Sequence, residues 1–184
     1  MIAPVWLACG YGISEFAIAT LLRSKAESSS TDRGSLRMLM IVINTSVTLA
    51  VMAALSLHNL YFGTPALYWI GVAVFVLGLA LRWYSIATLG RFFTVDVAIA
   101  ADQTVIKTGP YKFLRHPSYT GVLLAFLGLG LCFANPISLV LFVVPPTFAF
   151  LLRIKVEEQA LQNGLGDPYS LYIRHTKRLI PFVY

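Results

Sequence analysis

The sequence predicts an all-α membrane protein, a single domain over residues 1–184 that crosses the bilayer five times. Hydrophobic residues make up 58% of the chain and charged residues only 12%, and the mean hydropathy is +0.75. A soluble domain cannot cover itself with so little polar surface. The apolar runs are also close to the length that a membrane helix needs. We expect spans at about residues 2–22, 36–61, 65–89, 117–134 and 136–154.

The basic residues predict the orientation of these spans. All 14 Lys and Arg fall on one side of a five-span arrangement, in residues 23–37, in residues 89–115 and in the tail, with Arg82 and Arg153 counted at the nearest span ends. The positive-inside rule then puts the N-terminus outside and the tail, residues 155–184, in the cytoplasm. The net charge of +6 therefore indicates membrane orientation and does not indicate a nucleic-acid partner.

Two charged residues interrupt the first and third apolar runs. The first run has no Lys or Arg before it and is too long for the apolar region of a secretory signal, so we expect it to remain as a span. Glu15 lies inside it, where a carboxylate is costly unless it faces a partner or a wet cavity. It is either part of a site or a protonated or water-facing residue without a role. Arg82 either extends to the interface or belongs to a site.

The last two spans should form a tight hairpin, because only Asn135 and Pro136 separate them. The preceding segment, residues 89–115, is too polar to span and suits an interfacial or partly extended segment. Three glycines of the hairpin allow close approach of another backbone or a ligand: Gly121, Gly128 and Gly130. Cys9 and Cys132 have no spacing typical of a metal site, so we expect two small buried residues and no metal.

The tail should contain two short helices that dock on the hairpin or on the membrane face. The first, VEEQALQNG, is expected to be separate from the last span and to end at Asn163 or Gly164. Asp167 and Pro168 are typical of the N-cap and the first turn of the second helix.

One stretch, GPYKFLRHPSYTG at residues 109–121, predicts an anion site at the start of the fourth span. Pro117 can open the helix, and Arg115 and His116 stand just outside it. Free N–H groups, the positive end of the helix dipole and a guanidinium then meet at one place.

The predicted topology gathers distant charged residues at the same membrane face. They are Arg82, Arg115, His116, Arg153, Glu157 and Glu158. Together with several tyrosines they suit a zwitterionic ligand, because arginine binds a carboxylate, glutamate binds an ammonium, and aromatic rings bind an adenine or a sulfonium.

Several motifs in order carry a family resemblance. GPYKFLRHPSYTG is followed by GLG at residues 128–130, NPI at 135–137, an arginine and EE at 153–158, then YSLY and IPF. Over roughly residues 81–182 this resembles the isoprenylcysteine carboxyl methyltransferase family. The resemblance implies a membrane methyltransferase that uses S-adenosylmethionine and yields S-adenosylhomocysteine. The expected acceptor is lipophilic, such as a prenylcysteine-type carboxyl, at the inner membrane face.

The resemblance also implies site residues. The cofactor pocket would be lined by Val105, Ile106, Tyr111, His116, Tyr119 and Glu158. We expect Arg115, from the anion site at the start of the fourth span, to bind the cofactor with them. Arg82 and Arg153 would hold the acceptor carboxylate, and Arg153 can alternatively orient the third expected catalytic residue, Glu157, four positions further along the helix.

Two other functions remain open from the residues alone. The acceptor can be a lipid phenol or enol, or the amine of a phospholipid headgroup, which must lose a proton and would need a base such as Glu157, His175 or Glu15. Outside enzymes, the chain can be a transporter or binding protein for an anionic lipid. The sequence does not determine the acceptor or the oligomeric state.

Overall fold

The computed structural model describes residues 2–21, 30–95, 99–100 and 102–180, and within these residues the chain is helical and contains no strand. The helices are α1 (Ile2–Leu21), α2 (Ser30–Ser56), α3 (Pro65–Leu89), α4 (Pro117–Phe133), α5 (Pro136–Leu165) and α6 (Asp167–His175). Short 3-10 helices lie at His58–Leu60, Gly90–Phe92 and Gly109–Lys112. The predicted all-α fold is confirmed.

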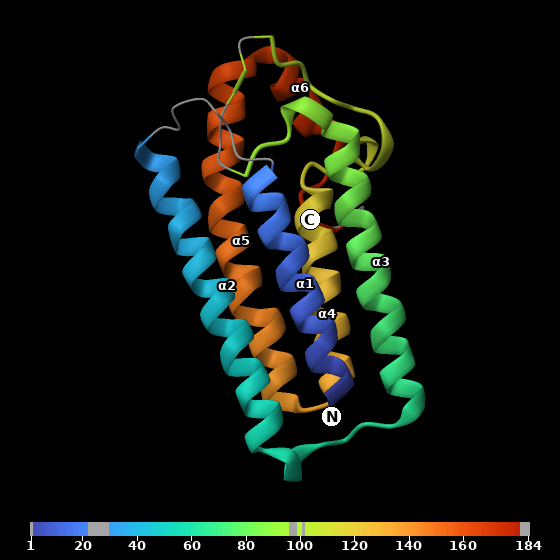
Figure 1. Ribbon diagram of the computed structural model, residues 1–184. Helices are drawn as coiled ribbons and strands as arrows, with labels where there is room; N and C mark the ends of the chain where they lie inside the picture. Colours follow the sequence, from blue (N-terminus) through green and yellow to red (C-terminus); the bar gives the residue numbers. More distant parts are fainter. Residues whose placement is uncertain (1, 22–29, 96–98, 101, 181–184) are drawn as a thin grey trace.

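The five long helices lie side by side in a bundle, and α6 covers one end of it (Figure 1). Helix α4 is central, because α3, α5 and α1 all pack against it, while α2 packs mainly against α5. Most of the residues of α4 are buried, including Phe126 and Leu129 at its middle. These helix–helix contacts therefore hold α3 and α5 on either side of α4, next to its start.

Three helical segments are long and apolar enough to cross a bilayer: Gly34–Ser56, Pro65–Phe92 and Pro136–Leu165. The segment Pro117–Phe133 is a shorter apolar helix of 17 residues. The protein is thus an integral, multi-pass membrane protein. The count of five spans and the sides of the two termini stay predictions.

Helix α2 is displaced from the predicted span at 36–61. It begins at Ser30 and ends at Ser56. The Leu57 carbonyl accepts hydrogen bonds from the Asn135 side chain (2.9 Å) and from the Leu60 amide (3.0 Å), and a 3-10 turn replaces the expected last turn of the helix. The sequence stays hydrophobic past Leu57, but the α-helical hydrogen bonds of the backbone do not continue.

The separate tail helix predicted after residue 154 is wrong, because α5 continues unbroken to Leu165. The residues between Arg153 and Gln162 are nearly all good helix formers, so the loss of hydrophobicity does not interrupt the backbone. Gly166, with φ of 61°, ends the helix. The predicted N-cap of α6 is also wrong by one position: Gly166 is the N-cap and Asp167 is the first residue.

Glycines bring α3 and α4 into backbone contact. A Cβ added to Gly78 would lie 2.4 Å from the Ala125 nitrogen, and one added to Gly121 would lie 2.7 Å from the Arg82 nitrogen. The predicted close approach is confirmed at Gly121 and Gly128, where the partner is the backbone of α3. This contact holds Arg82 next to the first turn of α4.

The tail docks on the segment that precedes α4. The Arg115 amide donates to the Lys177 carbonyl (2.7 Å), the Lys177 amide donates to the Phe113 carbonyl (3.2 Å), and Thr120 donates to the Leu179 carbonyl (2.7 Å). Of the two predicted docking places, the hairpin and the membrane face, the tail contacts the hairpin, at Thr120 of α4. Residues 22–29 of the first connecting loop and the closing residues 181–184 lie outside the described part of the chain.

The two cysteines differ in burial. Cys132 is buried, as predicted, with its sulfur 3.6 Å from the Tyr68 carbonyl oxygen. Cys9 is exposed, which corrects the prediction. It lies on α1, whose large exposed residues Trp6, Ile13 and Phe16 are apolar, so this helix presents a lipid-compatible outer face.

Candidate functional site: a charged cavity at the α6 end of the bundle

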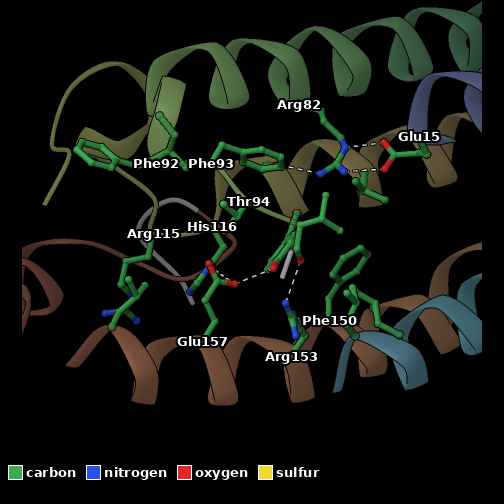
Figure 2. Close-up of a pocket in the computed structure, with 18 of the residues that line it drawn as sticks. Glu15, Arg82, Phe92, Phe93, Thr94, Arg115, His116, Phe150, Arg153 and Glu157 are labelled. Carbon is green, nitrogen blue, oxygen red and sulfur yellow. Dashed lines mark hydrogen bonds and ion pairs between the residues drawn. The ribbon is translucent and has the colours of Figure 1, made fainter. Parts of the chain in front are cut away.

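A cavity of about 450 Å³ extends between the helices toward α6, within the size range of small-ligand sites. Its wall beside α1 and α2 is largely apolar, with Ala8, Leu39 and Val47 among the lining residues. The wall formed by the starts of α4 and α6 and by the second half of α5 is aromatic and charged (Figure 2). The cavity therefore has two continuous parts: an apolar arm beside α1 and α2, and a polar arm beside α4, α5 and α6.

Most of the predicted site residues line this one cavity. They are Arg82, Val105, Ile106, Tyr111, Arg115, His116, Tyr119, Arg153 and Glu157. Glu158 does not line it and lies behind Arg115 and His116. Of the alternative bases, Glu15 and Glu157 line the cavity, whereas His175 is exposed at the end of α6.

Arg82 forms a two-point ion pair with Glu15 of α1. Its Nε lies 2.6 Å from Glu15 Oε1 and its Nη2 lies 2.6 Å from Oε2, while Nη1 donates to the Ser118 hydroxyl at 2.8 Å (Figure 2). The side chain of Arg82 is 10% exposed and that of Glu15 is 27% exposed. Arg82 therefore does not extend to the interface; it is held inside the cavity wall by a parallel carboxylate fork.

The predicted anion site at the start of α4 holds a carboxylate of the chain itself, that of Glu158. Arg178 donates to Glu158 Oε2 from Nε (3.0 Å) and Nη2 (2.8 Å). Arg115 Nε lies 2.9 Å from Oε1 and His116 Nε2 lies 3.4 Å from it, both without the alignment of a hydrogen bond. Glu158 lies here because α5 continues as one helix to Leu165.

Glu157, one residue earlier on α5, faces the opposite side of His116. The Tyr119 hydroxyl donates to Glu157 Oε2 at 2.7 Å, and His116 Nδ1 lies 3.8 Å from the same oxygen. The rings of His116 and Tyr119 are stacked, with centroids 5.5 Å apart. The HPSY sequence thus places a ring pair against a carboxylate at the cavity wall.

Arg153 is only 1% exposed and connects three segments. Its Nη1 donates to the Ser35 hydroxyl of α2, and its Nη2 donates to the Val95 carbonyl at 3.0 Å. It also lies against the Tyr119 phenol. Arg153 therefore ties α5 to α2 and to the segment before α4.

Tyrosines form the part of the cavity wall nearest α6. The Tyr172 hydroxyl lies 2.7 Å from the Tyr111 carbonyl oxygen and 3.2 Å from that of Leu114, so its single proton is shared between them. Burial raises the pKa of Tyr172 to about 12 and also raises the pKa of Tyr111 and Tyr169 above the usual value. All three phenols are neutral donors at physiological pH.

Tyr169 and Tyr172 are among the lining residues that the sequence did not assign to the site. Both line the cavity, and Tyr172 also docks the tail through its hydrogen bond to the Tyr111 carbonyl. Their spacing of three residues puts them on one face of α6, which was a usable indication that both point toward the site.

Buried polar atoms test whether a ligand such as the implied cofactor fits here. The Tyr169 hydroxyl is buried and makes no hydrogen bond within the described residues, whereas Arg115 Nε and His116 Nε2 face Glu158 Oε1 at 2.9 Å and 3.4 Å. A buried polar atom without a hydrogen bond costs free energy, so the Tyr169 hydroxyl suits a ligand with a polar group. The charged and aromatic lining of this part of the cavity suits a zwitterionic ligand with an aromatic part. The described residues contain no cluster of His, Cys, Asp or Glu suited to a metal ion.

A multi-pass helical bundle with a buried ionic cavity that continues into an apolar arm defines a class: membrane proteins that bring a polar ligand and a lipophilic one together. Comparisons with known proteins make the class specific. The model of the isoprenylcysteine carboxyl methyltransferase family matches residues 69–163. The chain belongs to this family of membrane methyltransferases.

Individual relatives agree with the family match. The chain is similar to protein-S-isoprenylcysteine O-methyltransferase B of Arabidopsis thaliana, with 30% identity over 94% of this chain and 82% of the relative. It is also similar to the Saccharomyces cerevisiae protein-S-isoprenylcysteine O-methyltransferase, with 34% identity over 62% of this chain and 48% of that protein. A solved eukaryotic intramembrane Ras methyltransferase has a TM-score of 0.64 and 29% identity, over 74% of this chain and 52% of the solved one.

Proposed function

We propose that this protein transfers a methyl group from S-adenosylmethionine to the carboxyl group of a prenylcysteine-type acceptor. The observation that supports this most directly is the single cavity in which the Arg82 guanidinium lies between an apolar arm and a polar arm. The relatives that carry this activity in their names favour a carboxyl acceptor over a lipid phenol, enol or amine. No observation favours an anionic-lipid transporter.

The polar arm is the proposed cofactor site. Arg115 and His116 would bind the carboxylate end of S-adenosylmethionine, and Glu157 would face its ammonium group. Val105, Ile106, Tyr111, Tyr119 and Tyr169 would pack against its aromatic and apolar parts. Glu158 would act from behind the wall by holding Arg115 and His116 in place. When bound, this cofactor supplies a sulfonium methyl group with a neutral thioether as the leaving group.

The apolar arm and Arg82 form the proposed acceptor site. The walls of α1 and α2 would take the prenyl chain, and the Arg82 fork would hold the carboxylate in the planar two-point geometry that a guanidinium favours. Arg153 is engaged by Ser35 and the Val95 carbonyl, so we assign it a positioning role at the junction of the two arms.

The residues contribute charge placement and exclusion of water. A carboxyl group has an unperturbed pKa near 4, so the acceptor is already ionised and no general base is required. An anion and a cation combine in the reaction, and a dry wall of apolar and neutral phenolic side chains favours that loss of charge. Holding the two reactants in line can contribute on the order of 7 kcal/mol or more.

We further infer that the cavity opens to the cytoplasm. In the five-span arrangement predicted from the sequence, all 14 Lys and Arg fall on the same side of the membrane as the tail. Residues 1–184 then act as one domain, with the cofactor entering from the cytoplasm and the acceptor from the bilayer.

The test uses purified full-length protein in detergent. Isothermal titration should show micromolar binding of S-adenosylhomocysteine. With a labelled methyl donor, N-acetyl-S-farnesylcysteine should be methylated, whereas a fatty phenol and phosphatidylethanolamine should not. Binding of the product cofactor without methylation of the acid would contradict the acceptor, and absence of binding would contradict the cofactor.

A further inference from the structure

The Arg82 guanidinium is the group proposed above to bind the acceptor carboxylate. In this structure it is already paired with another carboxylate, that of Glu15. Glu15 occupies its Nε and Nη2 edge with two contacts of 2.6 Å, and Ser118 accepts from Nη1 at 2.8 Å. A guanidinium presents a planar two-point edge to a carboxylate. An acceptor that seeks the same edge meets an occupied site.

Both carboxylates cannot use Arg82 at once without cost. A second anion beside one cation in a poorly screened cavity is repelled by the first, and like charges at contact distance prevent both from staying ionised and bound. The Arg82 side chain is 10% exposed, so water does not screen the pair as it would at a surface. Binding of the acceptor anion therefore requires Glu15 to leave the fork.

Glu15 is placed so that it can leave. Its side chain lines the cavity and is 27% exposed, almost three times the exposure of Arg82. It is carried by α1, which packs mainly on α4, through contacts such as the edge-to-face pair of Tyr11 and Phe126 at 5.1 Å. Much of the remaining surface of this helix is open, since Trp6 and Ile13 are each 71% exposed.

We propose that Glu15 is an internal competitor for the acceptor carboxylate: it neutralises Arg82 in the empty site and is exchanged for the acid when the acceptor binds. This rests on the proposed function. The exchange makes Glu15 a specificity-determining residue, because a neutral ligand such as the methyl ester product cannot replace it on Arg82. The acid binds by taking over the fork, and the ester, once formed, returns the fork to Glu15.

A permanent brace is the competing role, and it predicts the opposite result. If Glu15 only holds Arg82 in position, its removal leaves the guanidinium misplaced, so the acid binds more weakly or reacts more slowly. If Glu15 competes, its removal frees the fork, so the acid binds more tightly. The sign of the change in acid affinity separates the two roles.

The experiment compares Glu15→Gln and Glu15→Ala with the parent and with Ile13→Ala. Ile13 is 71% exposed on the same helix and does not line the cavity. Steady-state methylation of N-acetyl-S-farnesylcysteine gives KM and kcat. Direct titration with S-adenosylhomocysteine present gives the Kd of the acid and of its methyl ester.

We expect both Glu15 variants to lower the KM and Kd of the acid about tenfold, the worth of one lost charged contact. We expect the Kd of the ester to stay within about twofold, and Ile13→Ala to match the parent. Unchanged or weaker acid binding would overturn the proposal. Failure of both variants to fold, judged by gel filtration and cofactor binding, would also overturn it, because the ion pair would then be a structural brace. A parent protein that binds the cofactor but leaves the acid unmethylated would instead overturn the proposed function.

Discussion

At the scale of single residues, the site consists of charges that the bundle has buried in pairs. A buried guanidinium is tolerated when its hydrogen bonds are met, and removal of one partner leaves the other charge uncompensated. Arg82 is bound by Glu15 and Ser118, and Glu158 is bound by Arg178 and approached by Arg115. The Arg82–Glu15 pair lies apart from Arg115 in the cavity (Figure 2), and Glu158 lies behind Arg115, outside the cavity lining. Variants in each cluster should therefore affect different ligands.

Arg82→Ala should reduce methylation of the acid at least about 100-fold, because the variant has no fork for the acceptor. Binding of S-adenosylhomocysteine should stay within about twofold, since Arg115 and His116 are untouched. The substitution leaves the Glu15 carboxylate without its partner, so the double variant Arg82→Ala/Glu15→Gln is the control. Labelled methyl transfer and isothermal titration measure the two effects. Equal loss of both would show that Arg82 is not an acceptor residue.

Glu158→Gln should weaken the binding of S-adenosylhomocysteine about tenfold, because Arg115, His116 and Arg178 lose the anion that holds them. Isothermal titration measures the change, and Gln159→Ala, at an exposed neighbour on α5, is the matched control. A Glu158→Gln protein that binds as tightly as the parent would remove Glu158 from the support of the cofactor site.

Sequence reasoning could identify the cations of the site but not their partners. Arg82, Arg115 and His116 are apparent because charged residues stand out in apolar runs and beside Pro117. The pairing of Arg82 with Glu15, 67 residues away, depends on how α1 packs against α4, and no local pattern encodes that contact. For the same reason the anion predicted near Arg115 could not be assigned to the chain itself.

At the scale of the elements, the start of α3 and the starts of α4 and α5 were predictable, and the ends of α2 and α5 were not. Proline at the first helical position fixed the starts at Pro65, Pro117 and Pro136. Hydropathy was a poor guide to the ends, because it indicates where the membrane stops and not where hydrogen bonding stops. The continuation of α5 matters most, since it places Glu157 and Glu158 on a rigid helix instead of in a tail.

Gly78→Ala should destabilise the contact between α3 and α4. The new Cβ would lie 2.4 Å from the Ala125 nitrogen, so the helices must separate, at a cost of about 1–3 kcal/mol. Arg82 is one turn further along α3, so activity should also fall. Gly10→Ala on α1 is the control, because its Cβ would meet nothing within 4 Å and the residue does not line the cavity. Thermal unfolding in detergent measures the effect, and an unchanged Tm for Gly78→Ala would contradict the tight backbone contact.

Tyr172→Phe should loosen the docking of α6, because the Tyr111 and Leu114 carbonyls lose their donor, at about 1–2 kcal/mol. Tyr172 has a folded-state pKa of about 12, above the unfolded value near 10. Its contribution is therefore fully present below pH 10 and is lost as the pH rises toward 12. The difference in Tm between parent and variant should be constant up to about pH 9.5 and shrink above it. A difference that grows with pH would contradict the buried neutral phenol.

At the scale of the whole molecule, composition and charge asymmetry predicted the class of protein without any knowledge of packing. With 58% hydrophobic residues the chain needs lipid around it, and the exposed residues of α1 and α3, such as Trp6 and Trp69, are apolar. In the five-span arrangement predicted from the sequence, the basic residues instead fall on the same side of the membrane as the tail. This asymmetry predicts how the whole molecule is oriented and, with it, the compartment from which the proposed cofactor would enter.

Site-specific labelling should show the α6 end of the bundle in the cytoplasm. In a background with Cys9→Ala and Cys132→Ala, one cysteine is introduced at His58 or at Arg174, which are exposed at opposite ends of the bundle. An impermeant maleimide added to intact cells should label the His58→Cys protein and not the Arg174→Cys protein, because the positive-inside rule puts the basic end inside. Inside-out vesicles should reverse the pattern, and labelling after detergent treatment controls for reactivity. The opposite result in intact cells would place the cavity outside, where no cytoplasmic cofactor could enter it.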